Sequence, residues 1–188
     1  MSKIANPTKV ITGVNTRWSY ANVWDPKSIN GGAPKYSVSL IIPKSDTVTV
    51  NKIKAAIQAA YEEGESKLKG TAKVCPALDV IKTPLRDGDK ERPGDEAYKD
   101  SYFINATSKT APGIIDQNKI KLTDATALYS GCYVRVSINF YAFNFNGSKG
   151  IAAGLNNVQK WADGEFLGGC SNAESDFDEL DSDDDDLI

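Results

Sequence analysis

The 188 residues of this chain suffice for one domain of ordinary size, and 40% hydrophobic residues with 15 Gly and 8 Pro are typical of a β-rich globular protein. Because the sequence contains no histidine, Ser-His-Asp and Cys-His catalysis, the usual zinc sites and histidine pH switches are excluded. The formal net charge of −3 is unevenly divided, since residues 1–173 carry 22 Lys and Arg against 16 acids, a net charge of +6. This asymmetry predicts a polyanion site on the body and an interaction segment in the tail, the alternative being a tail that only aids solubility.

Nothing at the start of the chain predicts export or membrane insertion. MSKIANPTKVITG lacks the apolar core of a signal peptide, and no stretch approaches the roughly 20 apolar residues of a membrane span. The three cysteines, Cys75, Cys132 and Cys170, form no CxxC pair and are expected as small buried side chains in a reducing compartment. We therefore expect a cytoplasmic protein without membrane association, metal or cofactor.

The first third of the chain predicts three strands and one helix. Residues 8–14, 16–24 and 35–43 are rich in β-branched and aromatic side chains, and a Gly-Pro loop separates the last two. Strict alternation would place Trp18, Tyr20, Asn22 and Trp24 on one face. Apolar residues then recur at a 3.6 period, which predicts an amphipathic helix from about residue 47 to 63 or 69.

A charged, turn-rich stretch over residues 84–98 is expected to be a long surface loop. Its acids Asp87, Asp89, Glu91 and Asp95 suggest calcium, but an EF-hand loop needs Gly at the sixth position and Glu at the twelfth, and counting from Asp87 gives Arg and Tyr. A magnesium-dependent nuclease using Asp87, Asp89 and Asp95 is a further alternative, disfavoured because a flexible loop cannot hold the near-ideal metal geometry. We expect no metal site.

The second half of the chain predicts further strands. They cover residues 98–108, a short extended piece within 111–124, and 131–145, which carries the strongest signal; a turn at 146–150 leads to a paired strand or short helix over 151–161. Six or seven strands with a single helix favour a mainly β fold, a small closed or partly closed barrel.

The strand over 131–145 has two faces of different character. One face is apolar and suits a barrel interior, with Cys132, Val134, Val136, Ile138, Phe140 and Ala142. The other interleaves aromatic and basic side chains, as single-stranded nucleic acid requires, because bases stack on rings while cations follow the phosphates. The candidate contacts on this strand and beyond it are Tyr133, Arg135, Tyr141, Phe143, Lys149 and Lys160. The alternative is that a second layer covers these rings as ordinary core.

A second candidate patch lies on the predicted strand over 16–24. Tyr20, with Arg17 and Lys35 flanking it, could provide another stacking platform, whereas Trp18 and Trp24 are more typical of core. The stacking set predicted from the residues therefore spans two separate strands.

Several long segments resemble, in order, a family of phage-encoded single-stranded DNA-binding proteins. They are SYANVWDP, KYSVSLIIPKSD, LRDGD followed by SYFINA, LYSGCYVRVSINFYAFN and GSKGIAAGLNNVQKWADGEFLGG, and the resemblance covers residues 5–169. It implies an OB-fold-like five-stranded or slightly elaborated barrel over residues 1–169, followed by a disordered acidic tail over 170–188. It also implies binding of single-stranded DNA without sequence preference, no enzymatic activity, and a place in the cytoplasm of the infected bacterial host.

The resemblance further implies that the acidic tail recruits phage or host replication and recombination proteins. The residues that match such a tail are Asp183, Asp184, Asp185, Asp186, Leu187 and Ile188. The chain departs from the common pattern by ending in Leu187-Ile188 rather than in an aromatic residue, so the partner is left open. An acidic-tailed protein-interaction or chaperone module without nucleic-acid binding is the alternative function, and a homo-oligomer is compatible with the sequence.

Overall fold

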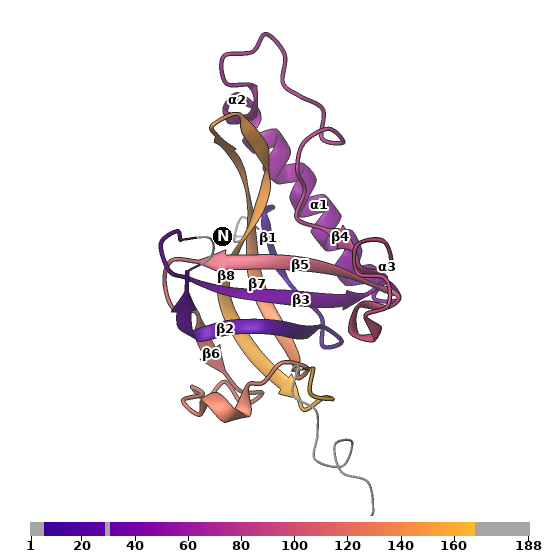
Figure 1. Ribbon diagram of the computed structural model, residues 1–188, viewed down its shortest axis with the longest axis vertical. Helices are drawn as coiled ribbons and strands as arrows, with labels where there is room; N and C mark the ends of the chain where they lie inside the picture. The colour runs from indigo at the N-terminus through magenta and orange to yellow at the C-terminus, as the bar shows by residue number, and fades with distance from the viewer. Residues whose placement is uncertain (1–5, 29–30, 168–188) are drawn as a thin grey trace, which may run out of the picture.

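Five strands close into a barrel in the computed structural model, which describes residues 6–28 and 31–167 (Figure 1). They are β2 (Arg17–Lys27), β3 (Lys35–Pro43), β5 (Ser101–Ser108), β7 (Tyr133–Phe145) and β8 (Ser148–Ala162). Hydrogen-bonded neighbours follow the order β2, β3, β5, β8, β7, and β7 returns to β2 at Tyr133 and Arg17. Only the β5–β8 pair in this ring is parallel. The predicted mainly β, OB-fold-like barrel is confirmed.

Short elements elaborate the barrel. The strands are β1 (Lys9–Ile11), β4 (Arg86–Asp87) and β6 (Gly113–Ile115), paired with β7, β5 and β8 respectively. The helices are α1 (Thr47–Glu63), α2 (Glu65–Lys69) and α3 (Gly88–Glu91), with 3-10 turns η1 (Glu96–Tyr98) and η2 (Ala125–Ala127). No helix in the described part of the chain is long and apolar enough to cross a membrane.

The predicted helix is confirmed over residues 47–63. The side chain of Asp46 caps its start by accepting a hydrogen bond from the Thr49 backbone N–H at 3.2 Å. Val50, Ile53 and Ile57 are buried in the barrel core, as the apolar period requires. The helix ends at Gly64, where a Cβ atom would collide with Ala142 of β7, so the close approach of α1 to β7 depends on this glycine.

The predicted interior of β7 is also confirmed. Its alternate side chains, from Cys132 to Ala142, are all buried. Beyond the barrel, β7 and β8 continue as a two-stranded arm, residues 141–152, which lies beside α2 (Figure 1). The amide nitrogen of Asn144 donates a hydrogen bond to the Lys67 carbonyl oxygen at 3.0 Å and fixes the arm to that helix.

A bulge in β2 overturns the prediction that Trp18 and Tyr20 share a face. Trp18 pairs with Leu40 and Asn22 with Ser37, so β2 contains one extra residue between these rungs, and Tyr20 has a positive φ of 48°. As a result Trp18 is fully buried, whereas Tyr20 is 60% exposed on the outer surface. Period-2 alternation is valid only for an unbroken ladder, which is why the sequence pattern failed here.

Other boundaries also differ from the sequence predictions. The expected loop over 84–98 contains β4, α3 and η1, and its last residue, Tyr98, is buried. The strand expected from residue 98 therefore begins at Ser101, and the strand expected over 8–14 is reduced to β1. Of the two alternatives for residues 151–161, the paired strand is confirmed, because they lie within β8. The predicted domain boundary at residues 169–170, the acidic tail and Cys170 lie outside the described residues.

Candidate nucleic-acid interface

The outer surface of β3, β5 and β8, called here the β3–β5–β8 face, carries small and polar side chains except at one end, where Ile41 and Phe103 pack with Tyr98. The register places Ser39 beside Asn105 and Ser37 beside Thr107, and Thr107 pairs in turn with Gly154 of β8. The side chains opposite in phase on β3 and β5, such as Leu40 and Ile104, fill the core. This face therefore offers a polar floor that side chains from neighbouring segments leave partly open.

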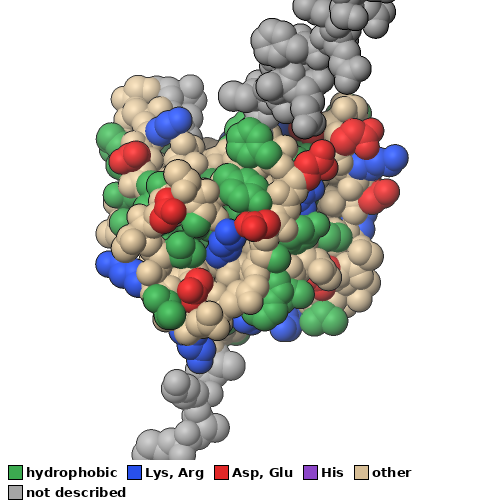
Figure 2. All heavy atoms as spheres, turned by 90° about the horizontal axis from the view of Figure 1, so that it is seen from below, with side chains coloured by type: hydrophobic (Ala, Val, Ile, Leu, Met, Phe, Trp, Pro, Cys, Tyr) green, Lys and Arg blue, Asp and Glu red, His purple; other side chains and the backbone are tan. Residues whose placement is uncertain are grey.

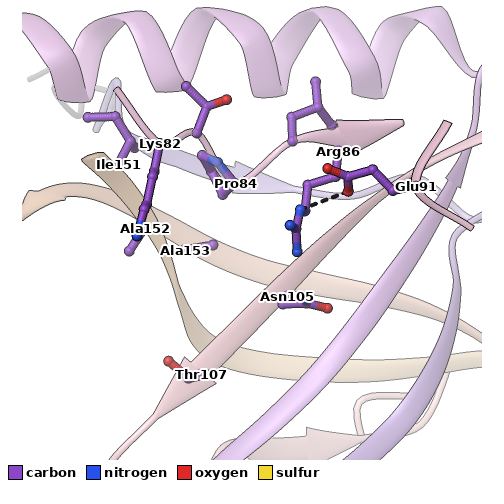
Figure 3. A pocket seen from close by; sticks show the side chains of 11 residues that line it. Lys82, Pro84, Arg86, Glu91, Asn105, Thr107, Ile151, Ala152 and Ala153 are labelled. Atoms are coloured by element: carbon purple, nitrogen blue, oxygen red, sulfur yellow. Dashed lines mark ion pairs between the residues drawn. The ribbon is translucent and has the colours of Figure 1, made fainter. Parts of the chain in front are cut away.

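A hollow of about 560 Å³ lies on this face, between β5, β8 and the segment over residues 82–91 (Figure 3). Lys82 and Arg86 lie on one side of it, and Asn105 and Thr107 on the other. The Lys82 backbone is fixed to the arm, because its carbonyl oxygen accepts a hydrogen bond from the Ile151 N–H at 2.8 Å. The hollow thus combines Lys82, an Arg86 side chain that is paired with Glu91 at 2.8 Å, and hydrogen-bonding side chains (Figure 3), groups that can contact a phosphate backbone.

Two aromatic rings of the arm, Tyr141 and Phe143, lie on β7 beside the part of β8 that lines the hollow, and neither ring lines the hollow itself. Tyr141 pairs with Ala152 and Phe143 with Gly150, so both rings project from the same surface as the hollow-lining Ala152. Tyr141 is 46% exposed. A Cβ atom at Gly154 would be only 3.6 Å from the Tyr141 ring, which shows that the ring extends over β8 at a point where no side chain covers it.

At the other edge of the β3–β5–β8 face, Tyr20 meets a cluster of aromatic rings around Arg92. The Arg92 guanidinium carbon lies 4.5 Å from the centroid of the Tyr98 ring and 5.3 Å from those of Tyr20 and Phe103. Tyr98 packs edge-on against Phe103 and shares a hydrogen bond of 3.1 Å with Ser39. Aromatic rings therefore flank the polar floor at both edges.

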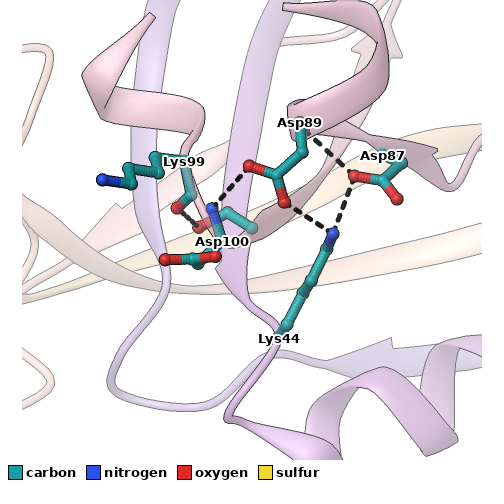
Figure 4. Close-up of polar contacts among 6 residues, drawn as sticks. Lys44, Asp87, Asp89, Lys99 and Asp100 are labelled. Atoms are coloured by element: carbon teal, nitrogen blue, oxygen red, sulfur yellow. Dashed lines mark hydrogen bonds and ion pairs between the residues drawn. The ribbon is translucent and has the colours of Figure 1, made fainter. Parts of the chain in front are cut away.

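The segment over 84–98 is fastened to the barrel by the carboxylates that had suggested a metal (Figure 4). Lys44 Nζ lies 2.8 Å from Asp87 and 2.7 Å from Asp89. These contacts raise the pKa of Lys44 and lower the pKa of both carboxyl groups. Asp95 caps η1 instead, accepting a hydrogen bond from the Ala97 N–H. Among the residues described, no three acidic or cysteine side chains gather in a metal-binding group.

Four of the predicted contact residues lie at the far end of the barrel, in internal contacts. Arg17 donates hydrogen bonds to the Gly131 and Glu165 carbonyl oxygens at 3.0 and 2.7 Å, and its guanidinium lies 5.6 Å from the Tyr133 ring. Lys160 forms an ion pair with Asp163 at 2.7 Å. Arg135 donates a hydrogen bond to Gln159 on the outer surface of β7 and β8.

Arg135 belongs to a second hollow, of about 360 Å³, over β1, β7, β8 and β6. The remaining predicted cations lie elsewhere. Lys35 is exposed at the start of β3. Lys149 pairs with Asn144, so it occupies the surface of the arm that faces α2, opposite Tyr141 and Phe143. Figure 2 shows the molecule from below. On this surface Lys and Arg side chains are interspersed with Asp and Glu, so it has no patch of a single charge.

Sequence analysis missed the cations closest to the β3–β5–β8 face, namely Lys82, Arg86 and Arg92. These residues lie in segments whose sequence has no helical or strand period. The sequence therefore predicted only loops there and gave no information on which side chains lie beside these cations. Asn105 and Thr107 were missed too, although the alternation of β5 identifies them as outward-facing once Ile104 and Ala106 are assigned to the core. No sequence signal places Arg92 beside Tyr20, because β3, α1 and α2 separate them along the chain.

Known phage proteins are similar to this chain in sequence and in fold. The model of the family described as "Enterobacter phage Enc34, ssDNA-binding protein" matches residues 8–188. Protein p50 of Acyrthosiphon pisum secondary endosymbiont phage 1 is 34% identical over 171 residues, covering 88% of this chain and 91% of p50. The structure of the bacteriophage Enc34 single-stranded DNA-binding protein in complex with ssDNA is 27% identical, with a TM-score of 0.68 over 87% of this chain and 91% of that one. The fold alone is shared with gp2.5, a single-stranded DNA-binding protein of bacteriophage T7, which is 15% identical with a TM-score of 0.60 over 92% of this chain and 99% of that one.

Proposed function

This chain belongs to the family of single-stranded DNA-binding proteins represented by that of Enterobacter phage Enc34, and we propose that it binds single-stranded DNA on its β3–β5–β8 face. The observation that carries the proposal is the combination on one surface of a polar floor, a hollow lined by Lys82 and Arg86, and aromatic rings at both edges. In OB-folds the surface of the second and third barrel strands receives oligonucleotides, and β3 and β5 are these strands here.

In this proposal the bases stack on Tyr141 and Phe143 at the arm and on Tyr20 at the opposite edge. Lys82 and Arg86 contact phosphates in the hollow, and Lys35 extends the basic track beside the loop that joins β2 to β3. Stacking tolerates any base because every base has an aromatic face, so binding is independent of sequence. The role is protection of the strand rather than catalysis. Arg17, Tyr133, Arg135, Lys149 and Lys160 lie away from this path and are not assigned contacts in it.

Lys82→Ala should weaken binding equally for all base compositions, since it removes one phosphate contact. The slope of log K against log salt concentration should fall in magnitude by about 0.7 per lost single-strand contact. Fluorescence titrations of labelled oligo(dT) at several salt concentrations measure this slope. The matched control is Lys52→Ala, which removes an exposed lysine from α1. Equal slopes for Lys82→Ala and the wild-type protein would remove Lys82 from the interface.

The acidic tail is proposed to compete with DNA and to recruit replication or recombination proteins. Nine acids follow residue 173, whereas the body before them has a net charge of +6. A short flexible connection gives a tethered segment an effective concentration in the millimolar range. Asp183, Asp184, Asp185 and Asp186 would attract a basic pocket on a partner protein, and Leu187 and Ile188 would provide an apolar anchor.

Removing residues 174–188 should therefore tighten DNA binding, most strongly at low salt, where the electrostatic competition is least screened. The same deletion should abolish capture of replication proteins. The measurement pairs oligo(dT) titrations of full-length and truncated protein at two salt concentrations with a pull-down of purified polymerase, helicase or recombinase. Unchanged affinity together with unchanged capture would reduce the tail to an aid to solubility.

A further inference from the structure

One cation on the surface of the molecule, Arg92, packs against aromatic rings and forms no ion pair within the described residues, although it lines a hollow with Asp89, Asp95 and Glu96. Arg92 lies over Tyr98, with Phe103 and Tyr20 each 5.3 Å from its guanidinium carbon. None of the ion pairs formed within the described part of the chain includes Arg92, although Arg86 in the same segment is paired with Glu91 at 2.8 Å. The guanidinium therefore keeps its charge and its hydrogen-bond donors for another group.

The position of Arg92 is fixed by contacts on both sides of it in the chain. Before it, Lys44 holds Asp87 and Asp89, and Gly88 packs so closely on Tyr98 and Ser101 that a Cβ atom would collide with their carbonyl oxygens. After it, Tyr98 is buried and bonded to Ser39. Binding a ligand here would consequently require little ordering of the arginine, which favours affinity.

Tyr20, the exposed ring beside Arg92, has an unusual backbone. It has a φ of 48° at the bulge in β2, although tyrosine carries a Cβ atom that disfavours this region. The strained conformation turns the ring out of the barrel, leaves it 60% exposed and brings it to the guanidinium. Strained positions that persist in a fold are concentrated at ligand sites.

We propose that Tyr20 and Arg92 form a nucleotide subsite at the β2 edge of the β3–β5–β8 face. A base of the single strand stacks on the exposed Tyr20 ring, and the Arg92 guanidinium donates hydrogen bonds to the adjoining phosphate. The subsite rests on the proposed function and extends it, because it makes the 84–98 segment, previously only a fastened surface loop, a part of the DNA interface. A planar guanidinium suits a phosphate with two parallel hydrogen bonds, which lysine cannot provide.

The alternative is that Arg92 only covers the Tyr98 and Phe103 rings as a structural staple. Four variants of the full-length protein distinguish the two roles: Tyr20→Ala, Tyr20→Phe, Arg92→Gln and Arg92→Lys. The control for loss of charge is Lys90→Gln, a neighbouring exposed lysine on α3 for which no ion pair or aromatic contact is found within the described residues. Affinity for labelled oligo(dT), the salt slope and the melting temperature are measured for each variant.

The subsite predicts that Tyr20→Ala weakens oligo(dT) binding about 5- to 150-fold, the effect of losing one stacked base, whereas Tyr20→Phe stays within about two-fold of wild type. Arg92→Gln should weaken binding and reduce the salt slope by about 0.7, unlike Lys90→Gln. Arg92→Lys should keep the slope yet bind more weakly than wild type, since it retains the charge without the planar donors. In the double variant Tyr20→Ala/Arg92→Gln, the fold-loss of oligo(dT) affinity should be smaller than the product of the fold-losses of the two single variants, because both residues contact one nucleotide.

Failure of the inference and failure of the proposed function give different results. A wild-type protein that does not bind oligo(dT) contradicts the proposed function itself. Wild-type binding with unchanged affinity in both Tyr20→Ala and Arg92→Gln overturns the subsite alone, and a lower melting temperature in those variants would then identify the staple. If Arg92→Gln does not fold, Arg92→Lys replaces it, and wild-type affinity in Arg92→Lys and Tyr20→Ala overturns the subsite equally.

Discussion

Replacing Tyr141 and Phe143 together by alanine is expected to weaken single-stranded DNA binding by about 2–6 kcal/mol. Each ring supplies one stacking surface, and a stacked base contributes about 1–3 kcal/mol. Both side chains project from the arm beside the small residues Ala152 and Gly150, so their removal leaves no cavity in the barrel core. The melting temperature should therefore change little, and titration with labelled oligo(dT) measures the affinity.

The matched control for these rings is Phe166→Ala, which removes an exposed ring near Tyr129 at the far end of the barrel. It should leave DNA affinity unchanged. Conversely, a double variant at Tyr141 and Phe143 that melts at a much lower temperature but binds oligo(dT) as tightly as wild type would show that the two rings serve packing only.

The largest stability effect is expected for Trp18→Ala. The side chain is fully buried, and its indole N–H donates a hydrogen bond of 2.8 Å to the Tyr129 carbonyl oxygen. Truncating a buried tryptophan costs about 3–5 kcal/mol of unfolding free energy, through lost burial and the cavity left behind. The carbonyl oxygen of Tyr129 would also lose this donor. Urea denaturation followed by circular dichroism measures the loss.

Trp161→Ala is the control for Trp18→Ala, because Trp161 is only half-buried at the end of β8. Its loss should cost clearly less. If Trp18→Ala unfolded at nearly the wild-type urea concentration, the stability of the barrel would not depend on the buried Trp18 side chain.

The sequence was sufficient to predict the elements that obey one uninterrupted period. Alternation along β7 identified its buried side chains correctly, and a 3.6 period with a capping Asp46 identified α1. Within β2 the same reasoning failed at Tyr20, because a bulge changes which residues face outward and no residue in the segment signals its position.

The candidate site was harder to predict than the fold, because it depends on pairings between distant segments. The parallel contact of β5 with β8 brings Thr107 to Gly154, and a bridge between Lys82 and Gly150 brings a loop lysine to the arm. Neither pairing leaves a local pattern in the sequence. Arg17 and Lys160 are the opposite case, in which the sequence suggested a DNA contact because each residue lies beside aromatic residues. In the structure Arg17 forms hydrogen bonds and Lys160 an ion pair within the chain.

Two outer surfaces of the barrel are candidates for DNA binding, and they differ in composition. The β3–β5–β8 face has aromatic rings at both edges, whereas the hollow around Arg135, over β1, β7, β8 and β6, has Ile11 and Ile115 among its lining residues. Alternation along the predicted strand placed Arg135 and Tyr141 on one face, because both project outward from β7. Curvature of the barrel separates them, since β1 and β6 flank the first part of β7 and β8 and the arm extends past both.

The most direct test of the β3–β5–β8 face is the change in backbone amide NMR shifts of the full-length protein during titration with oligo(dT). The account predicts the largest changes at Tyr20, in β3 and β5, at residues 150–154 and in the arm at Tyr141 and Phe143. Amides around Arg135, in β1 and β6, should stay near their free positions. Changes confined to β1, β6 and the Arg135 hollow, with β3 and β5 unaffected, would contradict it.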